Sequence, residues 1–197
     1  MKKIGIYCSI FVGDVSDRQI EYIAVDQGLK HLLDLDIKPI LVIGDLDSLE
    51  DKSLIHEFQI QRYSSIKDDT DTALALKVAI EKGYDTIDLY GVTHKRLDHF
   101  MAVLCLLQKY KDISITIYDE YNKIFLLHKG IHHIFKNGYK YFSLFAYKET
   151  YVTLKECHYP LDNYLLKKDD PLCVSNQMNE DYATVDVDQD ILFIQSR

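Results

Sequence analysis

The sequence lacks any apolar run approaching the roughly 20 residues that a membrane-spanning helix needs. Its first residues, 1–17, begin with two lysines and an apolar run. That run is short, contains glycines, and is not followed by the small residues of a signal-peptide cleavage site. We therefore expect a cytoplasmic protein that does not enter a membrane, with a first buried strand at 2–10.

The chain also lacks closely spaced cysteines and a positive net charge. Its four cysteines are far apart and form no C-x-x-C motif, which favours reduced thiols in the core over a disulfide or zinc framework. The formal net charge of −8 disfavours nucleic-acid binding, because that function needs a basic face. An acidic site can still bind a phosphate compound when a divalent cation lies between the two sets of negative charge.

The first 120 of the 197 residues alternate strand-like and helix-like segments. Continuous apolar runs rich in β-branched residues are typical of strands buried on both faces, and the helical segments have apolar faces ended by glycine or polar residues. This alternation predicts a mostly parallel sheet wrapped by helices. The expected strands are 2–10, 38–44, 85–91 and 113–119, and the expected helical segments are 18–35, 48–58, 70–83 and 96–110.

Beyond about residue 120 the pattern changes to short β-prone pieces broken by Gly, Asn, Asp and Pro. No long helical period follows, and this composition predicts a small β-sandwich or barrel. The chain has no flexible linker, low-complexity tract or internal repeat. We expect an α/β domain at 1–120 followed by a small β-sandwich domain at 121–197.

Acidic turns follow or precede three elements of the first domain. "GDLDS" follows the strand at 38–44, "KDDTD" precedes the helix at 70–83, and "GVTHKRLDH" follows the strand at 85–91. In an open α/β sheet, ligands bind beyond the carboxyl ends of the strands, so these turns are expected to converge there. Carboxylates crowded together repel unless a cation joins them, and Mg²⁺ prefers such oxygen ligands. The acids concerned are Asp45, Asp47, Asp68, Asp71 and Asp98.

Each turn alone has a purely structural explanation. A D-x-D after a strand is commonly a solvated turn, and "DDTD" can cap a helix through Asp69 or Thr70. Arg96 and Asp98 can form a surface ion pair of little energetic value. The combination of three acidic turns at one sheet edge, one of them bearing an arginine, favours a ligand site.

The motifs, taken in order, resemble those of the thiamine pyrophosphokinase family over nearly the whole chain. They are "AVDQG", "KPILVIGDLDSL", "KDDTDTALAL", "RLDH", "YFSLF", "HYPLDN", "VSNQ" and "ILFIQSR". The resemblance implies an α/β domain that binds ATP and Mg²⁺ and a β-sandwich that helps to bind thiamine. It also implies a homodimer with the substrate site at the subunit interface, and transfer of a diphosphate from ATP to the thiamine hydroxyl, leaving AMP.

The resemblance assigns roles to particular residues. Asp45, Asp47 and Asp71 correspond to the metal-binding acids, and Asp71, Arg96 and Asp98 are the expected catalytic residues. Arg96 is expected to pair with phosphate oxygens, and Asp98 to orient the hydroxyl or accept its proton. The expected ATP-binding residues are Asp26, Gly44, Ser48, Asp68, Thr70, Lys95, Arg96 and His99, and the expected thiamine-binding residues are Tyr159, Ser175 and Asn176.

The chain departs from the family pattern at a few motif positions. Two glycines that usually precede the arginine are His94 and Lys95 here, a common asparagine is Val103, and the "ADGG" and "SNE" motifs contain Gln27 and Gln177. Three other activities remain open: pyrophosphate transfer to another alcohol such as a pterin, a D-x-D glycosyl- or nucleotidyltransferase, and a regulator that binds nucleotide or thiamine without catalysis.

Overall fold

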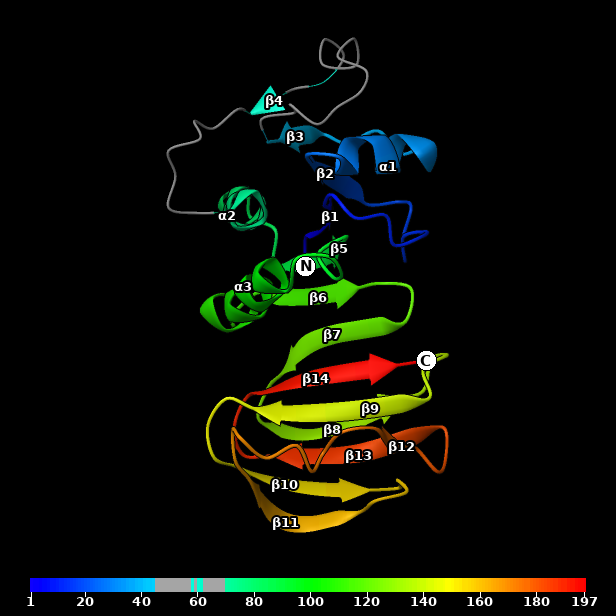
Figure 1. Ribbon diagram of the computed structural model, residues 1–197, viewed down its shortest axis with the longest axis vertical. Helices are drawn as coiled ribbons and strands as arrows, with labels where there is room; N and C mark the ends of the chain where they lie inside the picture. Colours follow the sequence, from blue (N-terminus) through cyan, green and yellow to red (C-terminus); the bar gives the residue numbers. More distant parts are fainter. Residues whose placement is uncertain (45–57, 59, 62–69) are drawn as a thin grey trace. The chain divides into compact units, whose positions relative to one another are not determined.

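The computed structural model describes residues 1–44, 58, 60–61 and 70–197. The chain forms two compact units, Met1–Glu120 and Tyr121–Arg197, called unit 1 and unit 2 below (Figure 1).

The described strands of unit 1 form a parallel sheet in the order β6-β5-β1-β2-β3-β4. The chain runs from β1 through β2 and β3 to β4, and then returns to β5 on the other side of β1. The strand order therefore reverses between β1 and β5, which is where open α/β sheets bind ligands. The strands are β1 (Lys3–Tyr7), β2 (Glu21–Val25), β3 (Leu41–Ile43), β4 (Ile60–Gln61), β5 (Thr86–Tyr90) and β6 (Ser114–Tyr118).

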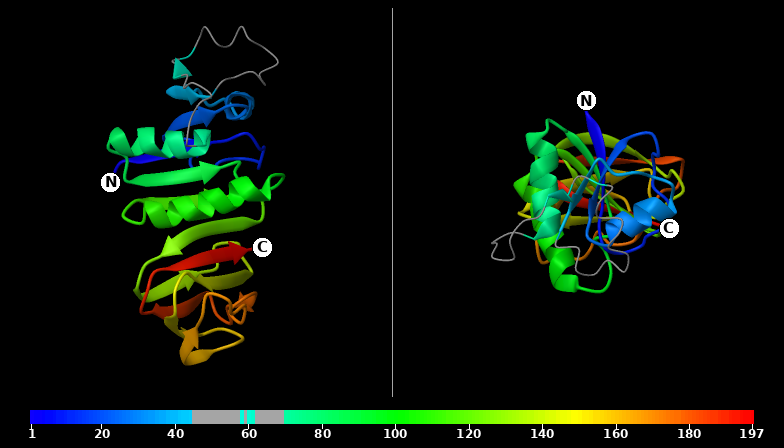
Figure 2. Two further views of the ribbon diagram at one scale, coloured as in Figure 1. Left: turned by 60° about the vertical axis from the view of Figure 1, so that its left-hand side comes forward. Right: turned by 90° about the horizontal axis from the view of Figure 1, so that it is seen from above.

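Helices cover both faces of this sheet. Helix α1 (Gly28–Asp34) lies on one face, and α2 (Asp71–Glu81) and α3 (Leu97–Lys109) lie on the other (Figure 2). On the α1 face, tyrosines from three strands pack with Leu29 and Leu32 of the helix. No helix in the described residues is long and apolar enough to span a membrane.

Helix α2 matches the helix expected at 70–83, and its ends have clear physical causes. Thr70 is the N-cap, and its Oγ1 accepts a hydrogen bond from the Ala73 N–H at 3.2 Å. Gly83 follows the helix with φ of +82°, a left-handed conformation that glycine adopts without steric cost.

The expected helical segment at 18–35 is wrong over its first part, because Glu21–Val25 is strand β2. The last four residues of β2 are all buried, so they form a continuous apolar run rather than one face of a helix. Strand β4 was not expected, and the helix expected at 48–58 lies almost wholly outside the described residues.

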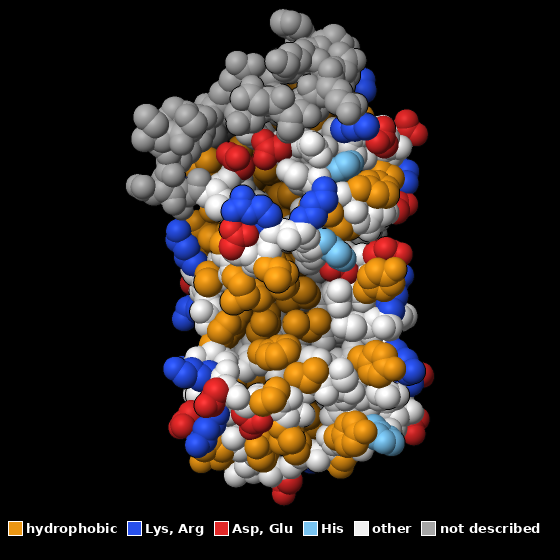
Figure 3. Space-filling model, in the orientation of Figure 1, with side chains coloured by type: hydrophobic (Ala, Val, Ile, Leu, Met, Phe, Trp, Pro, Cys, Tyr) orange, Lys and Arg blue, Asp and Glu red, His pale blue; other side chains and the backbone are white. Residues whose placement is uncertain are grey.

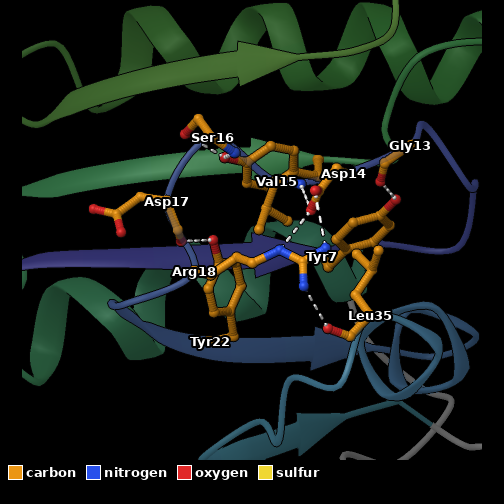
Figure 4. A network of polar contacts seen from close by, with 10 residues as sticks. Tyr7, Gly13, Asp14, Val15, Ser16, Asp17, Arg18, Tyr22 and Leu35 are labelled. Atoms are coloured by element: carbon orange, nitrogen blue, oxygen red, sulfur yellow. Dashed lines mark hydrogen bonds and ion pairs between the residues drawn. The ribbon is translucent and has the colours of Figure 1, made fainter.

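The connection between β1 and β2 contains no helix and is held by side-chain hydrogen bonds (Figure 4). The Tyr22 hydroxyl donates to the Asp17 carbonyl at 2.5 Å. The Arg18 guanidinium pairs with Asp14 at 2.9 Å and also donates to the Leu35 carbonyl at 3.2 Å. These contacts order the connection between β1 and β2, and the first residues of this connection directly follow the carboxyl end of β1.

A buried carboxylate lies within the sheet of unit 1. Asp88 of β5 has a side chain only 4% exposed, and its Oδ2 lies 2.7 Å from Lys3 Nζ of the neighbouring strand β1. The Ser16 hydroxyl donates a second hydrogen bond to Asp88 at 2.9 Å. Because a buried charge needs a partner, the ion pair with Lys3 and the hydrogen bond from Ser16 compensate the burial of this carboxylate.

Unit 2 consists of two antiparallel four-stranded sheets, ordered β12-β9-β14-β7 and β11-β10-β13-β8. Both sheets contribute to one core, which includes Phe142 and Phe193 from the first and Val152 and Val185 from the second. The strands are β7 (Asn122–Leu127), β8 (Gly130–Phe135), β9 (Tyr141–Ala146), β10 (Thr150–Lys155), β11 (Leu161–Leu166), β12 (Asn176–Gln177), β13 (Tyr182–Val187) and β14 (Ile191–Ser196). The expected fold class, a parallel α/β sheet followed by a β-sandwich, is confirmed, although β11 was not foreseen as a separate strand.

Candidate active site

A cavity of about 460 Å³ lies in unit 1 where the strand order reverses. Residues that follow β1, β2 and β5 line it, together with the N-terminus of α2 and the residues around the start of α3. The lining residues are Cys8, Ser9, Ile10, Val25, Asp26, Gln27, Thr70, Asp71, Thr72, Gly91, Val92, His94, Lys95, Arg96, His99 and Val103.

Two glycines allow the backbone around this cavity to approach closely. Gly44 has φ of +135°, and a Cβ at this position would collide with the Asp26 carboxylate. Gly91 has φ of +71°, and a Cβ there would lie 2.8 Å from the Cys8 carbonyl oxygen. At Gly91 the backbone conformation and the neighbouring carbonyl oxygens both exclude a side chain, whereas at Gly44 the conformation disfavours one and the Asp26 carboxylate would have to move.

Asp26 and Asp71 bring carboxylates to the cavity from different elements. Asp26 follows β2 with φ of +50°, and its N–H donates to the Ile43 carbonyl at 3.0 Å. Asp71 is the first residue of α2, next to the N-cap Thr70. An acid in the first turn interacts favourably with the positive end of the helix, which also attracts phosphate groups.

The turn between β5 and α3 has a left-handed backbone at two non-glycine residues, the positions where the motif resemblance led us to expect glycine. His94 has φ of +74° and Lys95 has φ of +54°. The His94 Nδ1 lies 2.9 Å from the Thr93 hydroxyl. Each non-glycine residue in this conformation costs roughly 1–2 kcal/mol. Both residues line the cavity, and strained residues of this kind are often found at functional sites.

Arg96 and Asp98 form a two-point ion pair at the start of α3. Arg96 Nη2 lies 2.5 Å from Asp98 Oδ2, and Arg96 Nε lies 3.1 Å from Asp98 Oδ1. Both side chains are about two-thirds exposed. The hydrogen bonds from Arg96 lower the pKa of Asp98 to about 2, so this carboxylate is ionised at neutral pH.

Cys8 is the one cysteine among the cavity-lining residues, and it is unsuited to nucleophilic chemistry. Its side chain is buried, and burial raises the pKa of the thiol to about 12. Its Sγ lies 3.6 Å from the Thr72 hydroxyl. Cys8 therefore remains a neutral thiol that packs the cavity wall.

The described part of the cavity holds six of the ATP-binding or catalytic residues expected from the sequence. They are Asp26, Thr70, Asp71, Lys95, Arg96 and His99. Gly44 lies next to Asp26, where an added Cβ would meet the carboxylate, and Asp98 pairs with Arg96. Asp45, Asp47, Ser48 and Asp68 lie outside the described residues. Within the residues that are described, no group of three or more His, Cys, Asp or Glu side chains is arranged to hold a metal ion.

Sequence reasoning missed several cavity residues, above all Cys8, Ser9 and Ile10 after β1. Their position directly after the first strand was an available signal, since the carboxyl ends of parallel strands share one edge. Thr72, Gly91 and Val92 were also missed.

The three residues expected to bind thiamine belong to unit 2. Asn176 is buried on β12, and its side chain bonds to the backbone of Tyr159. Tyr159 itself is 61% exposed. Ser175 is exposed with φ of +61°, and its N–H donates to the Ser143 hydroxyl at 3.0 Å. The structure thus joins Tyr159 and Asn176 directly.

Comparison with protein families gives two matches along the chain. Residues 13–118 match the model described as "Thiamin pyrophosphokinase, catalytic domain", and residues 131–192 match "Thiamin pyrophosphokinase, vitamin B1 binding domain". The first segment contains the entire cavity apart from residues 8–10.

Individual proteins give the same result. Thiamine pyrophosphokinase of Bacillus subtilis (strain 168) is 33% identical over 188 residues, which cover 91% of this chain and 88% of the relative. A crystal structure of thiamine pyrophosphokinase from Bacillus subtilis superposes with a TM-score of 0.89 at 30% identity, over 99% of each chain. The crystal structure from Geobacillus thermodenitrificans has a TM-score of 0.86 at 28% identity, over 99% of this chain and 97% of that one.

These similarities confirm the resemblance seen in the motifs, and with it the expected class of enzyme, a diphosphotransferase. The match extends through both units and includes the segments that form the cavity and the buried asparagine. The chain belongs to the thiamin pyrophosphokinase family.

Proposed function

We propose that the chain transfers the terminal diphosphate of ATP to the hydroxyl group of thiamine and releases AMP. The observation that carries this proposal is the cavity at the strand-order reversal of unit 1, within the segment that matches the family's catalytic domain. In this proposal residues 1–120 bind ATP and Mg²⁺, and residues 121–197 form the thiamine-binding domain.

Magnesium is proposed as the metal, held by Asp45, Asp47 and Asp71. The donor chemistry of Asp71 supports this, because a hard carboxylate lies at the cavity wall beside a helix N-terminus. Since Asp45 and Asp47 lie outside the described residues, their part in the site stays a prediction. A bound Mg²⁺ would neutralise phosphate charge and orient the nucleotide.

The N-terminus of α2 and the turn before α3 are proposed to bind the phosphates. Free N–H groups and the positive end of α2 favour an anion, and Lys95 and Arg96, in the turn before α3, add positively charged groups to the cavity lining. Positioning and charge stabilisation are most of what phosphoryl-type transfer requires from a protein. The other predicted ATP-binding residues stay predictions. They are Asp26, Gly44, Thr70 and His99, together with Ser48 and Asp68 outside the described part of the chain.

Asp98 is proposed to orient reacting groups rather than to act as the general base. An efficient base has a pKa near the working pH, whereas Arg96 lowers the pKa of Asp98 to about 2. A carboxylate of this kind fixes the arginine fork and accepts a hydrogen bond from the attacking hydroxyl. Of the two roles expected from the sequence, the lowered pKa supports orientation.

Thiamine is proposed to bind at the surface of unit 2 that carries Tyr159 and Ser175. The thiazolium ring of thiamine is cationic, and an exposed tyrosine ring attracts a cation to its face. This segment lies within the match to the vitamin B1 binding domain. Tyr159→Ala is expected to raise the thiamine KM much more than the ATP KM, and equal effects would argue against the assignment.

A homodimer with the substrate site at the subunit interface also stays a prediction, and we propose that the exposed face of α3 contacts the second copy of this chain. Leu97 and Met101 are 72% and 58% exposed and lie four residues apart, so they share one side of the helix with Cys105. Figure 3 shows hydrophobic side chains gathered over the face that α3 presents. Met101→Glu should shift sedimentation towards the monomer, while Lys109→Glu at the end of the same helix should not.

A cytoplasmic location stays a prediction.

One product assay separates the proposed function from its competitors. The protein is incubated with ATP, Mg²⁺ and one alcohol at a time, including thiamine and a hydroxymethylpterin, and AMP, ADP and pyrophosphate are measured. The proposal expects AMP to form when the alcohol is thiamine and not when it is one of the others. AMP with the pterin alone would change the substrate, and pyrophosphate would indicate a nucleotidyltransferase. A nucleoside diphosphate released only when a sugar nucleotide is supplied would indicate a glycosyltransferase, and tight binding without turnover would indicate a regulator.

A further inference from the structure

The loop that carries Tyr159 is fastened by one buried amide group, that of Asn176. Asn176 is 3% exposed. Its Oδ1 accepts hydrogen bonds from the N–H groups of Tyr159 at 3.0 Å and Gln177 at 2.9 Å. Its Nδ2 donates to the Tyr159 carbonyl at 2.8 Å and lies 3.5 Å from Cys157 Sγ. An amide has two acceptor and two donor positions, so all four are used within the protein.

The remainder of this loop is bonded to the same segment of chain. The His158 N–H donates to the Gln177 carbonyl at 2.8 Å, and Cys157 forms an isolated β-bridge with Met178. The Asn179 Nδ2 donates to the Cys157 carbonyl at 3.0 Å. The backbone before Tyr159 is therefore held residue by residue, and the Asn176 amide completes the attachment.

The side chain of Tyr159 contrasts with this rigid backbone. Tyr159 is 61% exposed, and its ring meets the His158 ring edge to face, with centroids 4.7 Å apart. A large aromatic surface on an ordered loop binds a ligand with little loss of conformational entropy, because the ordering has already occurred on folding.

We infer that Asn176 is a positioning residue, which acts on the substrate through Tyr159 and does not itself contact thiamine. The inference differs from the sequence-based expectation that Asn176 binds thiamine directly. It rests on the proposed function for the identity of the ligand, a cationic heteroaromatic ring. The mechanical part of it, that the Asn176 amide immobilises the Tyr159 loop, is independent of any ligand.

The mechanical part can be measured with a single fluorophore, because the natural chain contains no tryptophan. Tyr159→Trp places one indole on the loop, and time-resolved anisotropy reports its local motion. Adding Asn176→Ala is expected to increase the amplitude of the fast motion clearly. Val187→Ala, which removes core packing elsewhere in unit 2, should lower the melting temperature without this effect. Unchanged motion in the Asn176 variant would overturn the inference. If Asn176→Ala does not fold, Asn176→Ser is measured instead.

The functional part is tested by a double-mutant comparison. Asn176→Ala and Tyr159→Ala are each expected to raise the thiamine KM about tenfold with little change in the ATP KM, since losing a cation–π contact of 1–2 kcal/mol corresponds to that factor. The double variant should be no worse than Tyr159→Ala. Losses that multiply would show that Asn176 contacts the substrate independently. If the wild-type protein does not convert thiamine, the proposed function fails, whereas the anisotropy result still decides the role of Asn176.

Discussion

The Arg96 guanidinium holds the Asp98 carboxylate through two hydrogen bonds, with Nη2–Oδ2 at 2.5 Å and Nε–Oδ1 at 3.1 Å. The pair spans the boundary of α3, with Arg96 at the N-cap and Asp98 in the first turn. Each side chain thereby restricts the other beside the cavity, so the arginine fork is oriented before any phosphate arrives.

Removing the arginine should restore the ordinary acidity of Asp98. In Arg96→Gln, the pKa of Asp98 is expected to rise from about 2 towards its ordinary value of 3.8, because hydrogen bonds from Arg96 are the largest cause of the shift. The carboxyl carbon of Asp98, followed by NMR against pH, measures it. Lys95→Gln is the matched control and should leave the Asp98 titration in place. An Asp98 pKa near 2 in Arg96→Gln would contradict the assigned cause.

The lowered pKa of Asp98 also determines how the stability of the fold changes with pH. Because the folded state lowers the pKa of Asp98, its contribution to stability is present above pH 3.8 and is lost as the pH falls through about 2. The group is exposed, so the effect is small compared with that of buried groups. Arg96→Gln should therefore show a slightly flatter loss of melting temperature between pH 4 and pH 2 than the natural chain.

The left-handed conformation of His94 predicts an unusual order of stability. His94→Gly should be more stable than His94→Ala by about 1 kcal/mol, because glycine relieves the strain of 1–2 kcal/mol and loses part of that gain through unfolded-state entropy. For a chain of this size the difference corresponds to a melting temperature higher by about 2–4 °C. His99, inside α3, is the control, and there alanine should be more stable than glycine. If the alanine variant were more stable than the glycine variant at both positions, His94 would be unstrained.

Lys95 has the same backbone strain but also a charge beside the proposed phosphate site. Lys95→Met keeps much of the side-chain volume and removes the charge, so the ATP KM is expected to rise about tenfold, as for loss of a charged hydrogen bond. The thiamine KM should change little, and the salt dependence of the ATP KM should become weaker. An unchanged ATP KM would show that Lys95 does not contribute to ATP binding.

The buried pair of Lys3 and Asp88 predicts a large effect on stability away from the cavity. Lys3→Met leaves the Asp88 carboxylate buried without its cation and should lower the free energy of unfolding by about 3 kcal/mol, measured with urea. Adding Asp88→Asn removes the uncompensated charge and should restore part of the loss. A loss below about 1 kcal/mol in the single variant would mean that solvent reaches Asp88.

Much of unit 1 followed from the sequence because its signals are local. The run at 38–44 and the helix at 70–83 combine continuous or periodic apolar residues with glycine and threonine at their ends. The error at Glu21–Val25 has a physical reason. A run of buried residues next to a real helix has no period of its own, so apolar content alone could not separate strand from helix.

The candidate site was predictable in its chemistry but not in its backbone. The expected convergence beyond the strands' carboxyl ends is seen for Asp71 and Arg96, which line one cavity there, whereas Asp45, Asp47 and Asp68 lie outside the described residues. The left-handed φ of His94 and Lys95 did not follow from their residue types, because only a few per cent of non-glycine residues adopt a positive φ. The role of Asn176 depends on hydrogen bonds across 17 residues of sequence, which no local pattern encodes.

The central claim, that carboxylates at the cavity of unit 1 support diphosphate transfer from magnesium-bound ATP, is tested most directly by Asp71→Asn. This change keeps the size and the helix-start position of the side chain while removing one negative charge. AMP and thiamine diphosphate are quantified at saturating Mg²⁺, beside the melting temperature of each protein. We predict that both products form in equal amounts in the natural chain, and that turnover falls by a factor of about 100 or more in Asp71→Asn, with the fold intact. Near-normal turnover in Asp71→Asn would contradict the account.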